Sequence, residues 1–142
     1  MTQVTSTPQL RSLGKTVTEF QGLDPISIAT TVHKLMFISD EVTAICPVTG
    51  QPDLYTVTIK ILPNGLSIES KSLKLYLNEF RNSGIFAENL AAEINLAVIG
   101  CVRPIGCTTT VQQKSRGGIT LIAQARYGSN VPADDTERLE AI

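Results

Sequence analysis

The chain contains the stretch Leu54-Tyr55-Thr56-Val57-Thr58-Ile59-Lys60-Ile61-Leu62, in which apolar and polar side chains alternate. One side of the alternation carries Tyr55, Val57, Ile59 and Ile61. Because successive side chains of a β-strand point to opposite faces, this period of two predicts a strand that is buried on one side only. Such strands are typical of antiparallel sheets. We therefore expect an antiparallel sheet with one face packed on a core.

Three more strands are predicted from β-branched and apolar runs over residues 28–38, 107–114 and 119–127. Pro63-Asn64-Gly65 is a strong turn signal, and Ser115-Arg116-Gly117-Gly118 indicates a short hairpin connection. The strands therefore fall into two pairs, one at each end of the folded region.

Two helices are predicted between these pairs. The apolar positions of the first recur at i, i+3, i+4 and i+7, and they are Leu73, Tyr76, Leu77 and Phe80. Its N-cap is expected at Ser70 or Ser67, and Asn82-Ser83-Gly84 is expected to end it. The second helix is expected over residues 86–100, with Cys101 on its apolar stripe.

The resulting order, ββααββ, predicts an α+β fold in which two helices cover one face of a four-stranded antiparallel sheet. With 142 residues, one domain is the natural count. We expect an N-terminal arm over residues 1–27, the domain over 28–127 and an acidic tail over 128–142. An open sheet has two unpaired edges, so we also expect a homo-oligomer that protects them.

Composition excludes several classes of protein. A net charge of −1 disfavours a dedicated nucleic-acid binder, and no apolar run is long enough for a membrane span. Three cysteines are an odd number, which disfavours a disulfide framework and indicates a cytoplasmic location. Their spacing from each other and from His33, the only histidine, matches no common metal-site pattern, so no metal is expected.

A thiol and a carboxylate lie close together just before the alternating stretch, in Cys46-Pro47-Val48-Thr49-Gly50-Gln51-Pro52-Asp53. Two prolines and a glycine predict a fixed turn. Cys46 could attack an electrophile as the thiolate, and Asp53 could donate or accept a proton if it folds back across the turn. An inert buried thiol and an Asp residue that caps the turn would explain the same pattern.

Cationic residues suggest a site for an anion. Lys71 and Lys74 lie near the start of the first helix, and Arg116 stands beside the bare backbone of Gly117. A guanidinium next to glycine suits a phosphate group. A solvated basic helix face is the alternative, and no glycine-rich dinucleotide fingerprint follows a strand.

Three segments together resemble the QueF family of nitrile reductases, the 7-cyano-7-deazaguanine reductases of the queuosine pathway. They are the cysteine turn, Glu69-Ser70-Lys71-Ser72-Leu73-Lys74-Leu75-Tyr76 and Phe80-Arg81-Asn82. The resemblance continues through Arg116-Gly117-Gly118-Ile119 and covers roughly residues 40–127. The glutamate-serine-lysine segment is the signature of the family, and the short length resembles its unimodular subfamily.

The resemblance implies a tunnelling fold, in which subunits close their sheets into a barrel, and pentameric rings stacked as a decamer. It implies the reduction of the nitrile of 7-cyano-7-deazaguanine to the amine of 7-aminomethyl-7-deazaguanine, with NADPH as the cofactor. In that reaction Cys46 attacks the nitrile carbon to give a thioimidate, and Asp53 protonates the nitrogen.

Further roles follow from position in these motifs. Ile68, Glu69 and Ser70 are expected to contact the deazaguanine, and Glu88 is expected to bind its guanine-like edge. A carboxylate suits that edge because it can accept from both the ring N–H and the exocyclic amine. The residues expected to hold NADPH are Ser70, Lys71, Lys74, Arg116 and Gly117.

The chain departs from the family pattern at Ala87 and Ser83, where histidines are frequent. Two alternatives to reduction follow. One is an amidine-forming transferase that uses the same thioimidate on a 7-cyano-7-deazaguanine base, free or in nucleic acid. The other is a ring that binds deazaguanine without catalysis. The retained signature ranks reduction first, and nucleic acid is a partner only under the transferase alternative.

Overall fold

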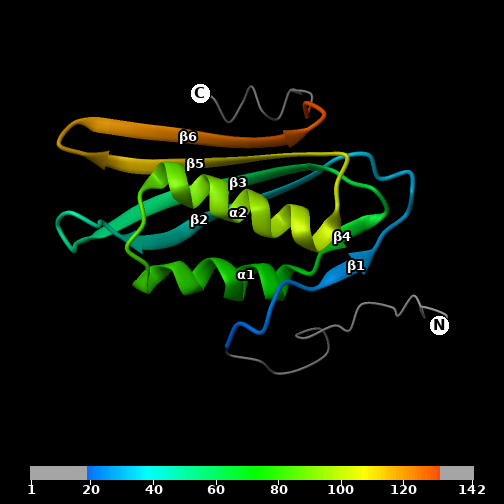
Figure 1. The fold of residues 1–142 in the computed structure, drawn as a ribbon, viewed down its shortest axis with the longest axis horizontal. Helices are drawn as coiled ribbons and strands as arrows, with labels where there is room; N and C mark the ends of the chain where they lie inside the picture. Colours follow the sequence, from blue (N-terminus) through cyan, green and yellow to red (C-terminus); the bar gives the residue numbers. More distant parts are fainter. Residues whose placement is uncertain (1–18, 132–142) are drawn as a thin grey trace, which may run out of the picture.

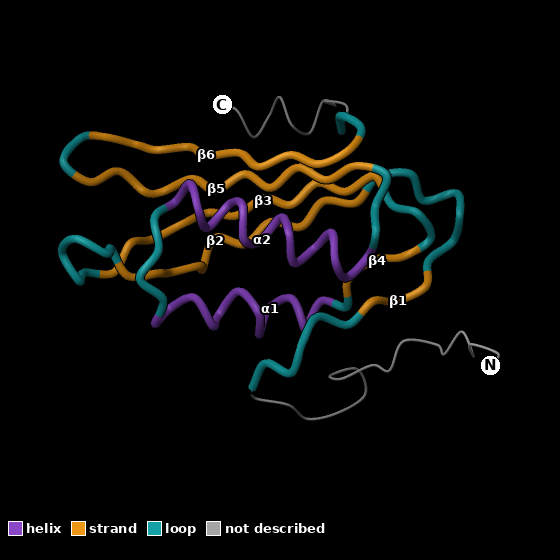
Figure 2. Tube along the Cα trace, viewed as in Figure 1, coloured by secondary structure: helices purple, strands orange, loops and turns teal. Residues whose placement is uncertain are grey.

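The computed structural model describes residues 19–131 as a four-stranded sheet packed on two helices, with a small two-stranded sheet beside them (Figure 1). The elements are β1 (Pro25–Ser27), β2 (Leu35–Ile45), β3 (Pro52–Leu62), β4 (Leu66–Ile68), α1 (Ser70–Asn78), the 3-10 helix η1 (Glu79–Asn82), α2 (Ala87–Val102), β5 (Gly106–Arg116) and β6 (Ile119–Gly128). The main sheet has the order β2-β3-β5-β6 and every pair in it is antiparallel. The predicted α+β class is confirmed, and Figure 2 shows the two long hairpins side by side.

Both helices cover the same face of the main sheet. The inward side chains of β3, which are Tyr55, Val57, Ile59 and Ile61, are each at most 1% exposed. They share one buried cluster with Leu73 and Leu77 of α1 and with Leu90, Ile94 and Val98 of α2. Burial of apolar surface is worth about 25 cal/mol per Å², so this single cluster holds the helices on the sheet. The alternation predicted for β3 is confirmed.

The strand predicted over residues 28–38 is displaced toward the cysteine turn. Residues 28–34 form a loop, in which the Val32 N–H donates to the Ala29 carbonyl at 3.0 Å, and β2 runs over Leu35–Ile45. The predicted end of this strand at residue 38 is also wrong, because the strand continues through Asp40 and Glu41. They lie in a bulge between Ser39 and Val42, where a register shift leaves both side chains exposed. A bulge on an edge strand lets two charged residues stay in water without ending the ladder.

A second, two-stranded sheet was missed because its strands are only three residues long. Pro25–Ser27 pairs antiparallel with Leu66–Ile68. Next to it, Asp24 is fully buried, and its backbone N–H donates to Ser72 Oγ at 3.0 Å. These contacts fasten the segment before the main sheet to the start of α1. The greater part of the predicted arm and tail lies outside the described residues.

The N-cap of α1 is Glu69 rather than Ser70 or Ser67. Its carboxylate accepts hydrogen bonds from the backbone N–H groups of Lys71 and Ser72, both at 2.8 Å. The first N–H groups of a helix lack partners within the helix, and a carboxylate there also interacts favourably with the helix dipole. Glu69 therefore has a structural role in addition to the substrate contact expected from the sequence.

Replacing the capping carboxylate should weaken α1. We expect Glu69→Ala to lower the free energy of unfolding by about 1 kcal/mol, because two backbone donors lose their acceptor. Chemical denaturation followed by circular dichroism measures this change. Ser70→Ala is the matched control, since Ser70 is exposed and is one of the two N-caps that the sequence predicted. A larger loss for Ser70→Ala than for Glu69→Ala would contradict the assignment of the cap.

Candidate active site

Cys46 lies in the turn between β2 and β3, which closes the first hairpin. The Cys46 N–H donates to the Gln51 carbonyl at 2.8 Å, and the Gly50 N–H donates back to the Cys46 carbonyl at 2.9 Å. Gly50 has a φ of +70°, a conformation that glycine adopts without steric cost. The turn predicted from its prolines and glycine is thus present, and it presents a partly exposed thiol.

The surroundings of Cys46 favour the thiolate. The Thr49 hydroxyl, followed by the backbone N–H groups of Thr49 and Val48, lowers the pKa of Cys46 below its ordinary value. Partial burial and the negative charge of Asp53 oppose this shift but are smaller. By contrast, burial raises the pKa of Cys107 to about 11, as expected for a core thiol. Cys46 is therefore suited to nucleophilic attack, and Cys107 is not.

Asp53 is held at the start of β3 by an arginine from the second hairpin. Its side chain is 7% exposed, and its Oδ1 lies 2.6 Å from Arg116 Nη1. The same guanidinium donates to the Pro52 carbonyl at 3.2 Å and to Gln51 Oε1. Charge-assisted bonds of this kind are strong and directional. The structure therefore joins two predicted groups, the proton donor and the cofactor-binding arginine, in one ion pair.

The tight β5–β6 connection places Arg116. Gly117 and Gly118 form the two-residue loop, and both have positive φ angles, of 60° and 80°, as the favoured hairpin turn requires. A register shift between Gln113 and Arg116 interrupts the regular pairing of β5 with β6 just before this loop. Arg116 consequently lies beyond the last residue of β5 that pairs with β3, across from the start of that strand.

The loop before α2 brings Glu88 to the same end of the sheet. The Ile45 N–H donates to the Ser83 carbonyl at 2.8 Å, and the Ile85 N–H donates to the Ile45 carbonyl at 3.1 Å. Ile45 directly precedes Cys46, so the first turn of α2, which carries Glu88, begins beside the cysteine turn. One end of the sheet thus collects Cys46, Asp53, Glu88, Arg116 and Gly117.

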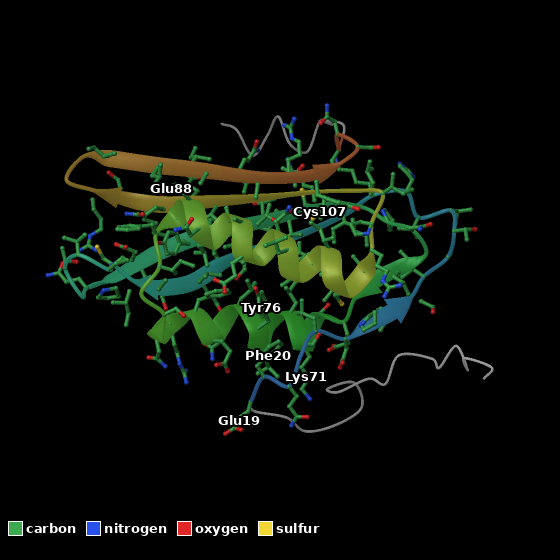
Figure 3. The ribbon with its side chains drawn as sticks, in the orientation of Figure 1. Glu19, Phe20, Lys71, Tyr76, Glu88 and Cys107 are labelled. Atoms are coloured by element: carbon green, nitrogen blue, oxygen red, sulfur yellow. The ribbon has the colours of Figure 1, made fainter. Side chains whose placement is uncertain are left out.

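The remaining predicted site residues lie at the other end of α1. Ile68 ends β4, and Glu69, Ser70, Lys71 and Lys74 cap or begin the helix. The nine residues of α1 and the four of η1 span about 20 Å before the chain reaches the loop beside Cys46. Figure 3 shows Lys71 and Glu88 well apart, with Glu88 at the upper left and Lys71 below the start of α1. Within one chain, the predicted site is therefore divided into a cysteine end and an α1 end.

A cavity of about 490 Å³ lies between α1 and β2. Ser70 and Lys74 of the α1 end line it, together with the bulged Asp40 and Glu41 and with apolar residues of both elements. Its volume suits a small organic ligand, and Lys74 supplies a cation for an anionic group. The lining contains no residue of the cysteine end.

Three residues of the cysteine end were not predicted as site residues. Thr49 and Gln51 are part of the turn, but their partners, the Cys46 thiol and the Arg116 guanidinium, depend on the folded geometry. Tyr55 is fully buried two residues after Asp53. The sequence does hold a signal for it, since Tyr55 is the only inward residue of the alternating stretch that carries a polar atom.

Two other features of the described part of the chain bear on its class. Within residues 19–131, no three His, Cys, Asp or Glu side chains are grouped to hold a metal ion. Over the same residues, no helix has the length and apolar character needed to cross a bilayer.

Comparison with known proteins places these features in a family. The family model of QueF-like proteins matches residues 52–132, which include every predicted site residue except Cys46. The NADPH-dependent 7-cyano-7-deazaguanine reductase of Frankia casuarinae is 41% identical over 107 residues, which are 75% of this chain and 86% of that protein. The protein of the same name from Prosthecochloris aestuarii is 42% identical over 97 residues, or 68% and 82% of the two chains.

A solved structure has the same fold at lower sequence identity. It is described as the archaeosine synthase QueF-Like in the apo form, and it matches with a TM-score of 0.65 at 21% identity. The match covers 70% of this chain and 97% of the solved one. The fold and the sequence comparisons agree, and the chain belongs to the family of QueF-like proteins.

Proposed function

We propose that the chain is an NADPH-dependent reductase that converts 7-cyano-7-deazaguanine to 7-aminomethyl-7-deazaguanine. The observation that carries this proposal is the cysteine end, where a thiol of lowered pKa shares a turn with a nearly buried carboxylate. The substrate and the cofactor are inferred from the names of the relatives given above, which are about 40% identical to this chain over most of their length. The cytoplasmic location inferred from the cysteines stays a prediction.

The first step is a nucleophilic addition. The Cys46 thiolate adds to the nitrile carbon, one π bond of the nitrile breaks, and the nitrogen takes a proton from Asp53. The product is a covalent thioimidate, which offers a better hydride acceptor than the nitrile itself. NADPH supplies the two hydrides that, with two protons, complete the four-electron reduction and free the thiol.

The ion pair at Asp53 sets a condition on that step. A carboxylate paired with a guanidinium has no proton to give, so Arg116 must leave Asp53 before the acid can act. Arg116 is 42% exposed and is also expected to bind the cofactor, whose phosphates compete for a guanidinium. Cofactor binding would thus release Asp53 and prepare the proton donor.

The residues present fit NADPH only if two copies of the chain contribute. Arg116 and Gly117 belong to the cysteine end, whereas Ser70, Lys71 and Lys74 belong to the α1 end. A site between copies brings such groups together without bending α1. The edge strand β6 supports association because it exposes Ile119, Leu121, Ile122 and Tyr127. We propose a homo-oligomer for this reason, and the family resemblance gives its size as stacked pentameric rings.

The amidine-forming transferase remains the second candidate function. It is kept because Ala87 and Ser83 stand where the family frequently has histidines. The solved archaeosine synthase QueF-Like is compatible with it, and at 21% identity that match speaks for the fold alone. Both functions share the thioimidate at Cys46 and differ in whether hydride follows it. Nucleic acid would be a partner of the transferase only.

Reduction has a defined stoichiometry. Purified protein mixed with 7-cyano-7-deazaguanine and NADPH should oxidise two NADPH per nitrile, because each hydride carries two of the four electrons. Absorbance of NADPH and the mass of the product measure this. Cys46→Ala should abolish turnover, and Cys101→Ala, which alters a thiol away from the turn, should not.

A stable adduct on Cys46 without any oxidation of NADPH would exclude reduction and favour the transferase. Substrate binding that is unaffected by Cys46→Ala, with neither adduct nor turnover, would instead support a ring that binds deazaguanine without catalysis.

The reactivity of Cys46 should reveal its stabilised thiolate. We expect alkylation of Cys46 by iodoacetamide to have a pH midpoint below that of an ordinary thiol, since the Thr49 hydroxyl stabilises the charged form. Removing that donor in Thr49→Val should move the midpoint to higher pH, whereas Thr49→Ser retains the hydroxyl and should not. Mass spectrometry of the peptide containing Cys46 measures each profile. Equal midpoints for Thr49→Val and the unaltered protein would remove Thr49 from the account.

A further inference from the structure

The hydroxyl of Tyr55 is buried without a partner. Tyr55 is 0% exposed. Within residues 19–131, its Oη is the one buried side-chain nitrogen or oxygen that lacks a hydrogen bond. Leaving a polar group unpaired in the interior costs folding free energy, and the ring alone would serve the packing. The presence of a hydroxyl at this position is therefore not explained by stability.

The position of Tyr55 connects it with the cysteine end. Asp53 and Tyr55 are two residues apart on β3, so their side chains lie on the same, helix-facing side of the sheet. Val42 of β2 and Gln113 of β5 flank Tyr55 in the ladder, which places it inside the sheet. Its hydroxyl is near enough to Asp53, Cys46 and Glu88 for all three negative charges to act on it.

The hydroxyl stays protonated and can therefore donate a hydrogen bond. Burial first, and then the charge of Asp53, raise the pKa of Tyr55 to about 12, so the phenol keeps its proton at physiological pH. Asp53 has the largest effect of the three charged neighbours, through its charge and more weakly as a hydrogen-bond acceptor. The contact between the two groups nevertheless lies outside ordinary hydrogen-bond geometry. Arg116 occupies Oδ1 of Asp53, and Oδ2 is the oxygen left for a second donor.

We propose that Tyr55 is a positioning residue for the proton donor of the site, and that its hydroxyl donates to the Asp53 carboxylate produced when Asp53 gives up its proton. As the Cys46 thiolate adds to the nitrile carbon, the electron pair of the broken π bond takes the proton of Asp53. A carboxylate remains in a nearly buried place. The Tyr55 hydroxyl stabilises that charge and keeps its own proton.

This inference rests on the proposed function, because it needs Asp53 to act as an acid. It adds a role for a residue that touches neither the nitrile nor the cofactor. Its effect should appear mainly in the rate of adduct formation, not in the affinity for substrate.

The test is a single-turnover measurement with NADP⁺ in place of NADPH, so that the phosphates of the cofactor are present but no hydride can be transferred. The protein is mixed with 7-cyano-7-deazaguanine, and the Cys46 adduct is followed by intact mass. Tyr55→Phe should form the adduct about 10-fold to 100-fold more slowly, because it lacks one hydrogen bond to a charged group. The substrate concentration at half-maximal rate should stay the same. Tyr76→Phe, which removes a phenol hydroxyl from α1 away from the cysteine end, is the matched control and should react at the unaltered rate.

Two further measurements separate positioning from packing. The melting temperature of Tyr55→Phe should be unchanged or higher, since an unpaired hydroxyl is removed. Asp53→Asn/Tyr55→Phe should react no more slowly than Asp53→Asn alone, because groups that act as one unit are not additive. Normal adduct formation by Tyr55→Phe, or loss of folding in that variant, would overturn the inference while the proposed function stands. Failure of the unaltered protein to form any adduct would overturn both.

Discussion

The length of α1 is the constraint on which the arrangement of the site depends. The helix is capped by Glu69 at one end and passes into η1 at the other, and the buried Leu73 and Leu77 fix it on the sheet. A helix held in this way cannot fold back to bring its first residues to Cys46. The groups expected to bind substrate and cofactor therefore lie in two separate regions of one chain. The simplest way to bring them together is for a second copy to place its α1 end beside the cysteine end of the first.

Within the cysteine end, two hairpins and one helix start meet through backbone geometry. The Cys46 turn presents the thiol, the glycine loop aims Arg116 back at Asp53, and the Ile45 contacts bring in the start of α2. Charges of both signs thereby come close together at the edge of the core. Asp53 is nearly buried, so a change in its partners has a larger electrostatic effect than it would in water. The ion pair with Arg116 and the Tyr55 hydroxyl therefore both affect how readily Asp53 gives up its proton.

Local patterns in the sequence predicted β3 and both helices from their periodicity, and the cysteine turn and the glycine hairpin from their prolines and glycines. Each of these elements is determined by local geometry. The predicted bounds of β2 were wrong, since a bulge at Asp40 and Glu41 lets this edge strand continue without ending the ladder. The cap was wrong because glutamate is not among the usual N-cap residues. The pairing of Arg116 with Asp53 joins residues 63 positions apart, and no local pattern reports such a contact. The environment of Tyr55 likewise depends on three elements at once.

Mixing of inactive subunits tests the central claim, that one site is built from two copies. Cys46→Ala removes the nucleophile, and Ser70→Ala/Lys71→Ala disables the α1 end while leaving the Glu69 cap in place. Each variant alone should be inactive, but refolding them together in equal amounts should restore about a quarter of the unaltered turnover, the share of sites that receive both intact halves by chance. If the mixture stays inactive although mass spectrometry shows mixed oligomers, each site must lie within one chain, and the account is contradicted.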